Sequence, residues 1–242
     1  MTKLCVATVV SVMIGLVPAA ALAQDRPVEK DLKEMAENVK KKAPDAAKVF
    51  EDGIAEVAKS GVVKAAPKIG DRVELFELPD ASGKTVKLAD LLAKGPVVLT
   101  WYRGGWCPYC NIGLRGMLKA EPKIRELGAT LMAVTPETPD SATETVKTNG
   151  LTFAVLSDKG NAVARRYKIV FKLPEKTSAA MKAFKLDLEK RNGDKSDELP
   201  LSATYVIDTD QTVRWAFVDA DYRKRAEPAD VLEALKALTT KK

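Results

Sequence analysis

The chain of 242 residues contains no histidine and only three cysteines. The absence of histidine excludes Ser-His-Asp and Cys-His catalytic arrangements, because both use an imidazole as the general base. It also excludes haem attachment through a C-x-x-C-H motif and any zinc site with a histidine ligand. We therefore expect no metal and no cofactor, and any cysteine chemistry must proceed without an imidazole.

The chain also lacks a large surplus of charge of either sign. Its formal net charge is +6, from 39 basic and 33 acidic residues that are interspersed along the sequence. No clustered basic stretch with aromatic residues is present, so the sequence predicts no nucleic-acid partner. Arg223 and Arg225, near the C-terminus, are interpreted as solvated side chains of this mixed surface.

The longest apolar run lies at the N-terminus. Lys3 precedes an almost uninterrupted apolar stretch over residues 4–17, and the sequence ALA at 21–23 fits a small-x-small cleavage site. The stretch is too short to span a bilayer comfortably, so residues 1–23 are predicted to be a secretory signal peptide. Cleavage would lower the net charge to +5 and remove Cys5. The remaining two cysteines would then lie in an oxidising compartment, for which the bacterial periplasm fits best, with no membrane attachment.

Residues 24–66 are predicted to form a helical N-terminal extension. Apolar residues recur at helical spacing on both sides of Pro44. They are Leu32, Met35, Ala36 and Val39 before it, and Phe50, Ile54, Val57 and Ala58 after it. We interpret these residues as a small core that packs against the main domain or against a second subunit, which would make a homodimer.

Residues 67–242 are predicted to form one α/β domain. The sequence RVELFELPDASGKTVKL indicates two short strands around a turn. Further strands are expected at 97–102, 129–135, 153–158, 203–208 and 212–218, and helices at 107–127, 136–148, 161–167 and 227–238. A polar, partly helical insertion is expected over 174–199. Strands that alternate with helices indicate βαβ units, and hence a central mixed sheet with helices on both faces.

Two cysteines stand close together in GPVVLTWYRGGWCPYCN, residues 95–111. Cys107 would begin a helix directly after a buried strand, and Pro108 suits the first helical position because its missing N–H is not needed there. The helix dipole and free N–H groups, including those near Gly104-Gly105, would lower the pKa of Cys107 from its free value of about 8.5. Cys110 would lie one turn further along, behind Cys107.

This placement predicts different roles for the two thiols. Cys107 would be the exposed nucleophile, and Cys110 the shielded thiol that displaces whatever becomes bonded to Cys107. The resulting disulfide would then need another thiol donor to reduce it. A structural disulfide is disfavoured because so short a loop constrains the unfolded chain little. A metal site is disfavoured because it needs about four ligands.

The same residues resemble a known family. WYRGGWCPYCN, with IGDRVELFELPDASGKTVKLADLL before it and ATYVIDTDQTVRWAFVDADYRKRAEP after it, is similar to the alkyl hydroperoxide reductase/thiol-specific antioxidant (AhpC/TSA, redoxin) family. The closest similarity is to its peroxiredoxin-like branch, over about residues 67–238. The resemblance implies a thioredoxin-like fold and a thiol-based antioxidant oxidoreductase. It also implies that Cys107 attacks peroxide to give a sulfenic acid, which Cys110 resolves. CPYC is also a glutaredoxin tetrapeptide, which suggests dithiol exchange.

Two positions depart from the family pattern. Typical peroxiredoxins carry Thr or Ser three residues before the reactive cysteine, where this chain has Gly104, and an Arg before the fourth core strand, where it has Ser202. Arg103 is a candidate for positive charge near the thiols, or a structural residue at a strand end. Trp106 and Tyr109 flank the thiols, either as an apolar docking surface for a partner or hydroperoxide or by simple packing.

Three functions follow from these observations. The first is a periplasmic antioxidant that reduces peroxides or oxidised thiols through Cys107 and Cys110, with a thioredoxin-like protein or a small thiol as electron donor. The alternative is a protein thiol–disulfide reductase, which the missing peroxidase residues favour. The third is a redox-sensitive binding or assembly protein, in which residues 24–66 make the contact and the cysteines switch its shape.

Overall fold

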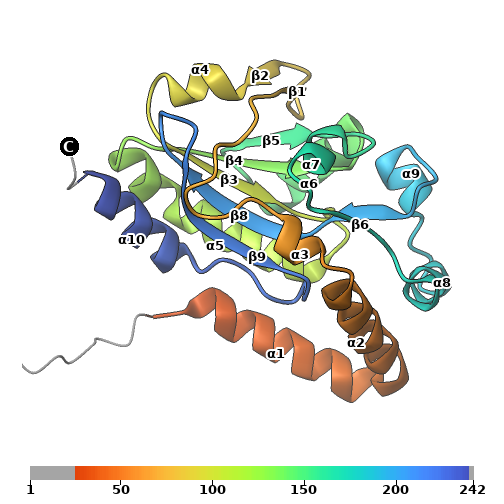
Figure 1. Ribbon diagram of the computed structural model, residues 1–242. Helices are drawn as coiled ribbons and strands as arrows, with labels where there is room; N and C mark the ends of the chain where they lie inside the picture. The colour runs from red at the N-terminus through yellow and green to blue at the C-terminus, as the bar shows by residue number, and fades with distance from the viewer. Residues whose placement is uncertain (1–24, 240–242) are drawn as a thin grey trace, which may run out of the picture.

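The computed structural model describes residues 25–239, so the predicted signal peptide lies outside the described residues. A five-stranded mixed sheet, in the order β5-β4-β3-β8-β9, forms the centre (Figure 1). Its strands are β3 (Val97–Trp101), β4 (Thr130–Thr135), β5 (Ala154–Ser157), β8 (Ser202–Ile207) and β9 (Val213–Asp219). β3, β4 and β5 are parallel, and β8 is antiparallel to both β3 and β9. Each of these strands lies within two residues of its predicted position.

Helices cover both faces of the sheet, as predicted. One face carries α5 (Pro108–Glu126), α6 (Pro139–Asn149) and α10 (Pro228–Thr239), and the other carries α4 (Leu88–Leu92) and α7 (Ala162–Arg166). The side chains of β3 alternate between the two faces, because successive residues of a strand point in opposite directions. Val98 therefore joins the core against α5, while Val97 and Leu99 join the opposite core.

Two short antiparallel ladders lie outside the central sheet. β1 (Glu77–Pro79) pairs with β2 (Thr85–Lys87), as the predicted turn requires, and β6 (Val170–Lys172) pairs with β7 (Glu198–Pro200). The insertion between β6 and β7 holds α8 (Glu175–Ala183) and α9 (Leu188–Asn192). Its helical character is confirmed, but the β6–β7 ladder was not expected, because three residues are too few to show an alternating pattern.

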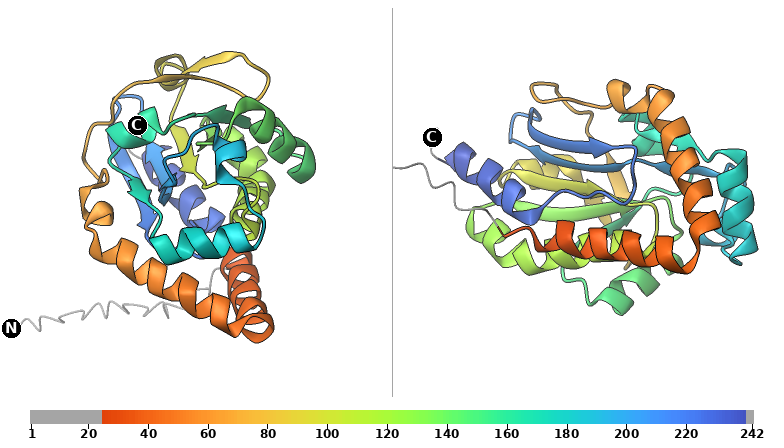
Figure 2. Two further views of the ribbon diagram at one scale, coloured as in Figure 1. Left: turned by 90° about the vertical axis from the view of Figure 1, so that its right-hand side faces the viewer. Right: turned by 90° about the horizontal axis from the view of Figure 1, so that it is seen from below.

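The N-terminal extension consists of α1 (Pro27–Lys42), α2 (Pro44–Lys59) and the short α3 (Val62–Ala65). We call α1 and α2 together the arm. Pro27 and Pro44 occupy the first positions of the two helices, where a missing N–H has no cost. α1 packs along α5, and its N-terminal end meets the start of α10, where Arg26 pairs with Asp230. α2 packs against α8 (Figure 2). The arm thus packs against the main domain of its own chain, the first of the two predicted arrangements.

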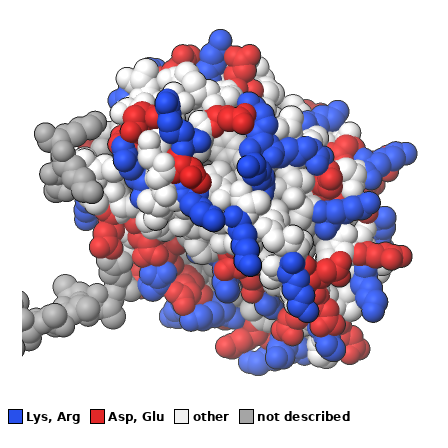
Figure 3. Space-filling view, in the orientation of Figure 1, with Lys and Arg blue, Asp and Glu red and all other residues white. Residues whose placement is uncertain are grey.

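Two sets of contacts hold the arm in place. At the start of α1, the Glu227 carboxylate accepts hydrogen bonds from the N–H groups of Val28 (3.4 Å) and Glu29 (3.0 Å). In α2, Gly53 packs so closely on α8 that a methyl group at this position would overlap Thr177 Oγ1. Acidic and basic side chains are interspersed over the face shown in Figure 3. Among residues 25–239, no helix is both long enough and apolar enough to cross a membrane.

Candidate active site

Both cysteines lie at the junction of β3 and α5. Cys107 is the N-cap residue of α5, Pro108 is its first residue, and Cys110 follows in the first turn. The predicted helix start is therefore confirmed. Both thiols are free, and they are 0% and 1% exposed. The prediction that Cys107 is exposed was wrong, because the residue is 0% exposed and borders only an internal cavity lined by side chains of the arm, α8 and the loop after β9.

Arg103 supplies a positive charge next to Cys107. Its Nη2 donates a hydrogen bond to Cys107 Sγ at 3.1 Å, and the side chain is only 4% exposed. The guanidinium carbon lies 3.5 Å from the ring centre of Tyr222 and 5.1 Å from that of Trp106. Aromatic rings on both sides stabilise a cation that has lost its water. Of the two interpretations of Arg103, the structure therefore supports a charge beside the thiol.

The two thiols have opposite acidities. Burial alone would raise the pKa of Cys107, but a hydrogen bond from Cys110 and the charges of Arg103 and Arg225 outweigh it and hold that pKa well below its ordinary value. Burial, the hydrogen bond to Cys107 and the negative charge of its thiolate raise the pKa of Cys110 well above the ordinary value. At neutral pH the arrangement therefore favours a thiolate at Cys107 and a protonated thiol at Cys110.

The cause of the acidity differs from the expected one. No N–H group of the first turn of α5 donates to the Cys107 side chain. The N–H of Gly105, expected to be free, donates instead to Glu137 Oε2 at 2.8 Å. The hydrogen bond to Cys107 comes from the side chain of Arg103, four residues earlier. A charged donor lowers a thiol pKa more strongly than a neutral amide, because charge-assisted hydrogen bonds are roughly twice as strong.

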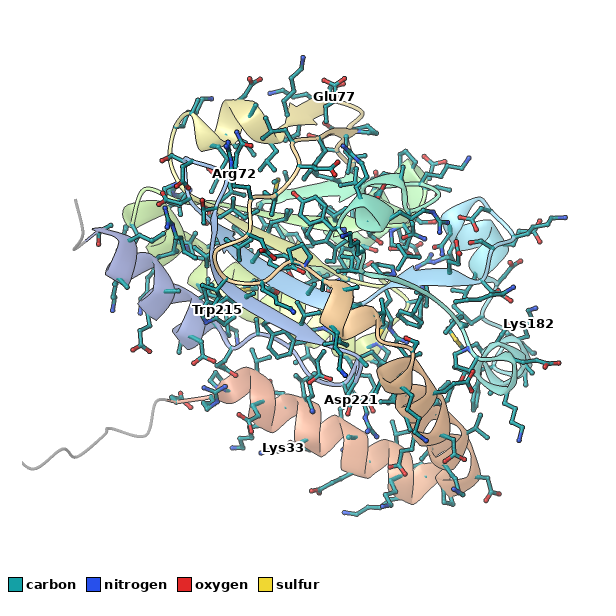
Figure 4. All side chains as sticks on the ribbon, viewed as in Figure 1. Lys33, Arg72, Glu77, Lys182, Trp215 and Asp221 are labelled. Atoms are coloured by element: carbon teal, nitrogen blue, oxygen red, sulfur yellow. The ribbon has the colours of Figure 1, made fainter. Side chains whose placement is uncertain are left out.

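Arg225 is the hydrogen-bond donor at the second thiol. Its Nη2 donates to Cys110 Sγ at 2.9 Å, so the expectation that it is solvated was wrong. Arg223 is also half-buried, and its side chain pairs with Asp221 (2.9 Å) and with Glu51 of the arm (3.5 Å). Asp221 lies between the end of β9 and the arm (Figure 4). No local pattern reveals these contacts, because Arg225 and Cys110 are 115 residues apart in sequence.

Gly104 departs from the family pattern for a steric reason. Its φ angle is +154°, and a methyl group at this position would overlap the indole nitrogen of Trp106. The Thr or Ser of typical peroxiredoxins therefore has no room here. Gly105 is similarly enclosed, since a methyl group there would overlap Thr145 Oγ1. The indole of Trp106 lies close to Gly104, where the family carries a hydroxyl.

Glu137, which follows β4, is a buried carboxyl beneath the site that sequence reasoning missed. Its side chain is 0% exposed, and its Oε1 lies 3.2 Å from Arg191 Nε. Burial raises its pKa to about 7, although the Gly105 N–H and Arg191 favour the charged form. Ionisation of Cys110 would raise this pKa further. Glu137 thus holds the backbone of Gly105 and is coupled electrostatically to the shielded thiol.

The remaining predicted residues divide between the site and the core. Tyr109 is buried beside Cys107, and its ring packs edge-on against Tyr222 at 5.6 Å. Ser202 begins β8, is 2% exposed, and its hydroxyl has no hydrogen-bond partner among the described residues. It therefore does not take the place of the family arginine by bonding to a thiol.

A cavity of about 530 Å³ adjoins Cys107. Its walls are mostly apolar and come from the arm, the insertion and the site itself. The apolar lining includes Met35, Val39, Phe50, Trp106, Tyr109, Met181, Phe184 and Leu186. Trp106 and Tyr109 thus pack in the site and also face this space. In residues 25–239, no group of three or more Cys, Asp or Glu side chains is placed to hold a metal ion.

A reduced pair of buried thiols at the start of a helix, after the central strand of a mixed sheet, defines a thioredoxin-like redox protein. The model of the AhpC/TSA family matches residues 69–216, which is more than half of the chain. The chain therefore belongs to the AhpC/TSA family, and the resemblance found in the sequence is confirmed.

Relatives of two kinds are similar to this chain. The thiol-disulfide oxidoreductase ResA of Bacillus anthracis is 32% identical over 103 residues, which cover 42% of this chain and 58% of ResA. A putative peroxiredoxin of Mycobacterium tuberculosis is 28% identical over 102 residues, which cover 42% of this chain and 66% of that protein. The matches thus span less than two thirds of these relatives.

Solved structures share the fold. The peroxidoxin BcpB from Mycobacterium tuberculosis superposes with a TM-score of 0.56 at 23% identity, covering 71% of this chain and 98% of BcpB. The bacterioferritin comigratory protein of Xanthomonas campestris gives a TM-score of 0.54 at 18% identity, covering 69% of this chain and 99% of that protein. At these identities the comparison shows the fold alone: α/β and thioredoxin-like.

Proposed function

We propose that this chain is an antioxidant oxidoreductase that reduces peroxides or oxidised thiols through the Cys107–Cys110 couple. The observation that carries the proposal is the unequal environment of the two sulfurs. Cys107 accepts a hydrogen bond from Arg103 and has a lowered pKa. Cys110 accepts a hydrogen bond from Arg225 but has a raised pKa. A nucleophilic thiolate beside a protonated resolving thiol is the pair that such a reaction needs.

The reaction with a peroxide ROOH takes two steps in the protein. The Cys107 thiolate attacks the terminal oxygen, the O–O bond breaks, and RO⁻ leaves and takes up a proton to give ROH. The sulfur is now a sulfenic acid. Cys110 then attacks this sulfur, its proton and the hydroxyl leave as water, and the Cys107–Cys110 disulfide forms. Two thiols of an external donor reduce the disulfide and are themselves oxidised to a disulfide.

Access to Cys107 favours a small substrate. The thiol has no exposed surface, and the adjoining cavity of about 530 Å³ has room for a small molecule rather than a folded protein. The similarity to ResA supports a second candidate, a protein thiol–disulfide reductase. For that activity the arm or the loop after β9 would have to move, because a partner's disulfide must come into contact with Cys107 before exchange.

The proposal includes a compartment, an electron donor and a division of the chain. Residues 1–23 have the charge and apolar pattern of a signal peptide, which supports export to the periplasm. The electron donor would be a thioredoxin-like protein or a small thiol. Residues 24–66 would be an extension to the catalytic domain at 67–242. A homodimer, which the sequence offered as the alternative to packing within one chain, is tested by sedimentation of the purified chain.

Stopped-flow fluorescence separates the two candidates, because Trp106 lies close to Cys107. The reduced protein is mixed with hydrogen peroxide or with insulin as a protein disulfide. Rapid oxidation by peroxide that disappears in Cys107→Ser supports the first candidate. If peroxide reacts no faster than with an ordinary free thiol while insulin is reduced rapidly, the second candidate is correct. Slow reaction with both would overturn the proposal.

A further inference from the structure

A second cavity lies between the N-terminal extension and the β6–β7 ladder, apart from the thiols. Its volume is about 610 Å³, and its walls come from the end of α2, from α3 and from residues 165–174 (Figure 1). We call this cavity the groove. Neither cysteine lines it, and neither does Arg103 or Arg225. The groove is therefore separate from the site at which the thiols react.

One wall of the groove is the outer edge of β6. In an antiparallel ladder, alternate residues exchange hydrogen bonds with the partner strand, and the residues between them direct their N–H and C=O groups to the other side. The Leu173 N–H donates to Asp197 O at 2.8 Å, which places residues 171 and 173 among the bonded ones. Val170 and Lys172 therefore direct their backbone groups away from β7, toward the groove.

This edge is open to a further strand. Among residues 25–239, no group outside the ladder forms a hydrogen bond with the backbone of Val170 or Lys172. Lys172 is exposed and Val170 is half-buried, so solvent reaches the edge. A strand edge with unpaired groups is a template for another strand, and several domains bind extended peptides in this way. The edge thus offers two N–H and two C=O groups to a peptide.

The rim of the groove is basic. Arg165, Lys168 and Lys172 line it, and Glu56 is the one acidic residue of the lining within residues 25–239. Arg165 is paired with Glu198, which follows in β7. Lys168 and Lys172 form no salt bridge within the described part of the chain, so their charges are free to attract a ligand. The groove therefore favours an acidic occupant.

The floor of the groove is apolar. Val57 at the end of α2, Val62 of α3 and Phe171 of β6 contribute to it, and all three pack on the core of this side of the sheet. Successive side chains of a docked strand point in opposite directions. One set would therefore lie on this apolar floor, while the other would face the basic rim or solvent.

We propose that the groove binds an extended acidic segment of a partner protein, which adds a third strand to the β6–β7 ladder. The backbone of the segment would pair with Val170 and Lys172, and its carboxylates would lie at Lys168 and Lys172. Basic side chains on a strand edge repel an identical edge, so the residues that attract an acidic strand also disfavour a second copy of this chain. The inference does not depend on the proposed function.

Peptides of equal charge test whether the backbone edge is used. The parent is an acetylated and amidated peptide of alternating Glu and Val, and its binding to the full chain is measured by fluorescence anisotropy. Two variants carry three N-methyl groups on alternate amides, on the Val or on the Glu residues, so each keeps one edge that can pair. A fourth peptide carries three N-methyl groups on consecutive amides, which blocks both edges.

The parent and at least one of the alternately methylated peptides should bind. The consecutively methylated peptide should bind at least tenfold more weakly, although its charge and its number of methyl groups are the same. Equal binding of all four peptides would mean that charge alone attracts them, and no binding of the parent would mean that the groove does not take an acidic strand. Either result would overturn the inference.

Charge reversal tests the basic rim. Lys168→Glu with Lys172→Glu should weaken binding of the parent peptide at least tenfold, because two attractive charges become repulsive. Lys119→Glu with Lys123→Glu is the matched control, since these lysines are exposed on α5, are also four residues apart and do not line the groove. The control should bind the peptide as the wild type does. An equal loss in both variants would contradict the assigned site.

A proline tests the edge from the side of the protein. Val170→Pro removes one N–H that faces the groove, and proline is tolerated on an edge strand where the N–H faces outward. Binding should weaken about fivefold, as expected for the loss of one backbone hydrogen bond, with thermal unfolding unchanged. Unchanged binding would count against the edge. A wild-type dimer that dissociates in Val170→Pro would show that a second copy occupies the groove, and would overturn the proposal.

Discussion

Arg103 should control the acidity of Cys107, and Arg103→Met tests this directly. Methionine has a similar length, so it fills most of the space between Trp106 and Tyr222 but removes the charge and the donor at 3.1 Å from Cys107 Sγ. We expect the pKa of Cys107 to rise. Below that new pKa, oxidation by peroxide should slow about tenfold for each pH unit, because only the thiolate reacts.

The size of the shift follows from the strength of the lost interaction. A hydrogen bond to a charged group contributes about 1.5–3 kcal/mol, and one pKa unit corresponds to about 1.4 kcal/mol. The pKa of Cys107 should therefore rise by about 1 to 2 units in Arg103→Met. Arg103→Lys keeps a positive charge but loses the planar guanidinium, so its shift should be smaller.

The assay is a pH titration of the thiolate by its ultraviolet absorbance, repeated as the pH dependence of the alkylation rate. Arg214→Met is the matched control, because Arg214 pairs with Asp208 and Asp210 on the surface. In Arg214→Met, the pKa of Cys107 should equal that of the wild type. If Arg103→Met shifts this pKa no further than the control does, the account of the site's electrostatics is wrong.

Three further predictions concern stability and access. Burial raises the pKa of Glu137 from 4.5 to about 7, so the folded state binds that proton more tightly than the unfolded state does. The free energy of unfolding should therefore fall by about 3 kcal/mol as the pH rises from about 4.5 to 7. Urea unfolding at several pH values should show that Glu137→Gln removes this dependence of stability on pH. Gly104→Thr should lower the free energy of unfolding by about 1–3 kcal/mol, because of the positive φ angle at this position and the overlap with Trp106. It should not speed the oxidation by peroxide. Thermal unfolding measures the first effect and stopped-flow fluorescence the second. Gly53→Leu should push α2 from Thr177 and speed alkylation of Cys107 by a bulky maleimide; an unchanged rate would mean that the arm does not limit access.

The features that were predictable from sequence depend on local patterns. The buried run of β3 and the Cys-Pro pair at the start of α5 are short-range signals, and both elements lie where they were expected. The helices of the arm were found in the same way, from apolar residues at helical spacing around Pro44. The same placement predicted the roles of Cys107 and Cys110, and the family resemblance added the attack on peroxide. Both remain part of the proposal.

The features that were missed depend on packing between distant segments. Arg225 contacts Cys110 only because the loop after β9 passes over α5, and no sequence pattern reports that contact. Tyr222 covers Arg103 for the same reason. The arm lines the cavity beside Cys107, and helical periodicity alone does not specify that placement. In the sequence, Glu137 cannot be told from a surface carboxylate in a loop, and only the fold places it under Gly105, whose N–H it accepts.

The most direct test of the central claim is to trap the first product of peroxide attack. The reduced chain and its Cys107→Ser and Cys110→Ser variants are treated with one equivalent of hydrogen peroxide in the presence of dimedone, and the modified peptides are identified by mass spectrometry. The account predicts a Cys107–Cys110 disulfide in the wild type and a sulfenic-acid adduct on Cys107 in Cys110→Ser. An adduct that forms equally fast on Cys110 in Cys107→Ser would contradict the assigned roles of the two thiols.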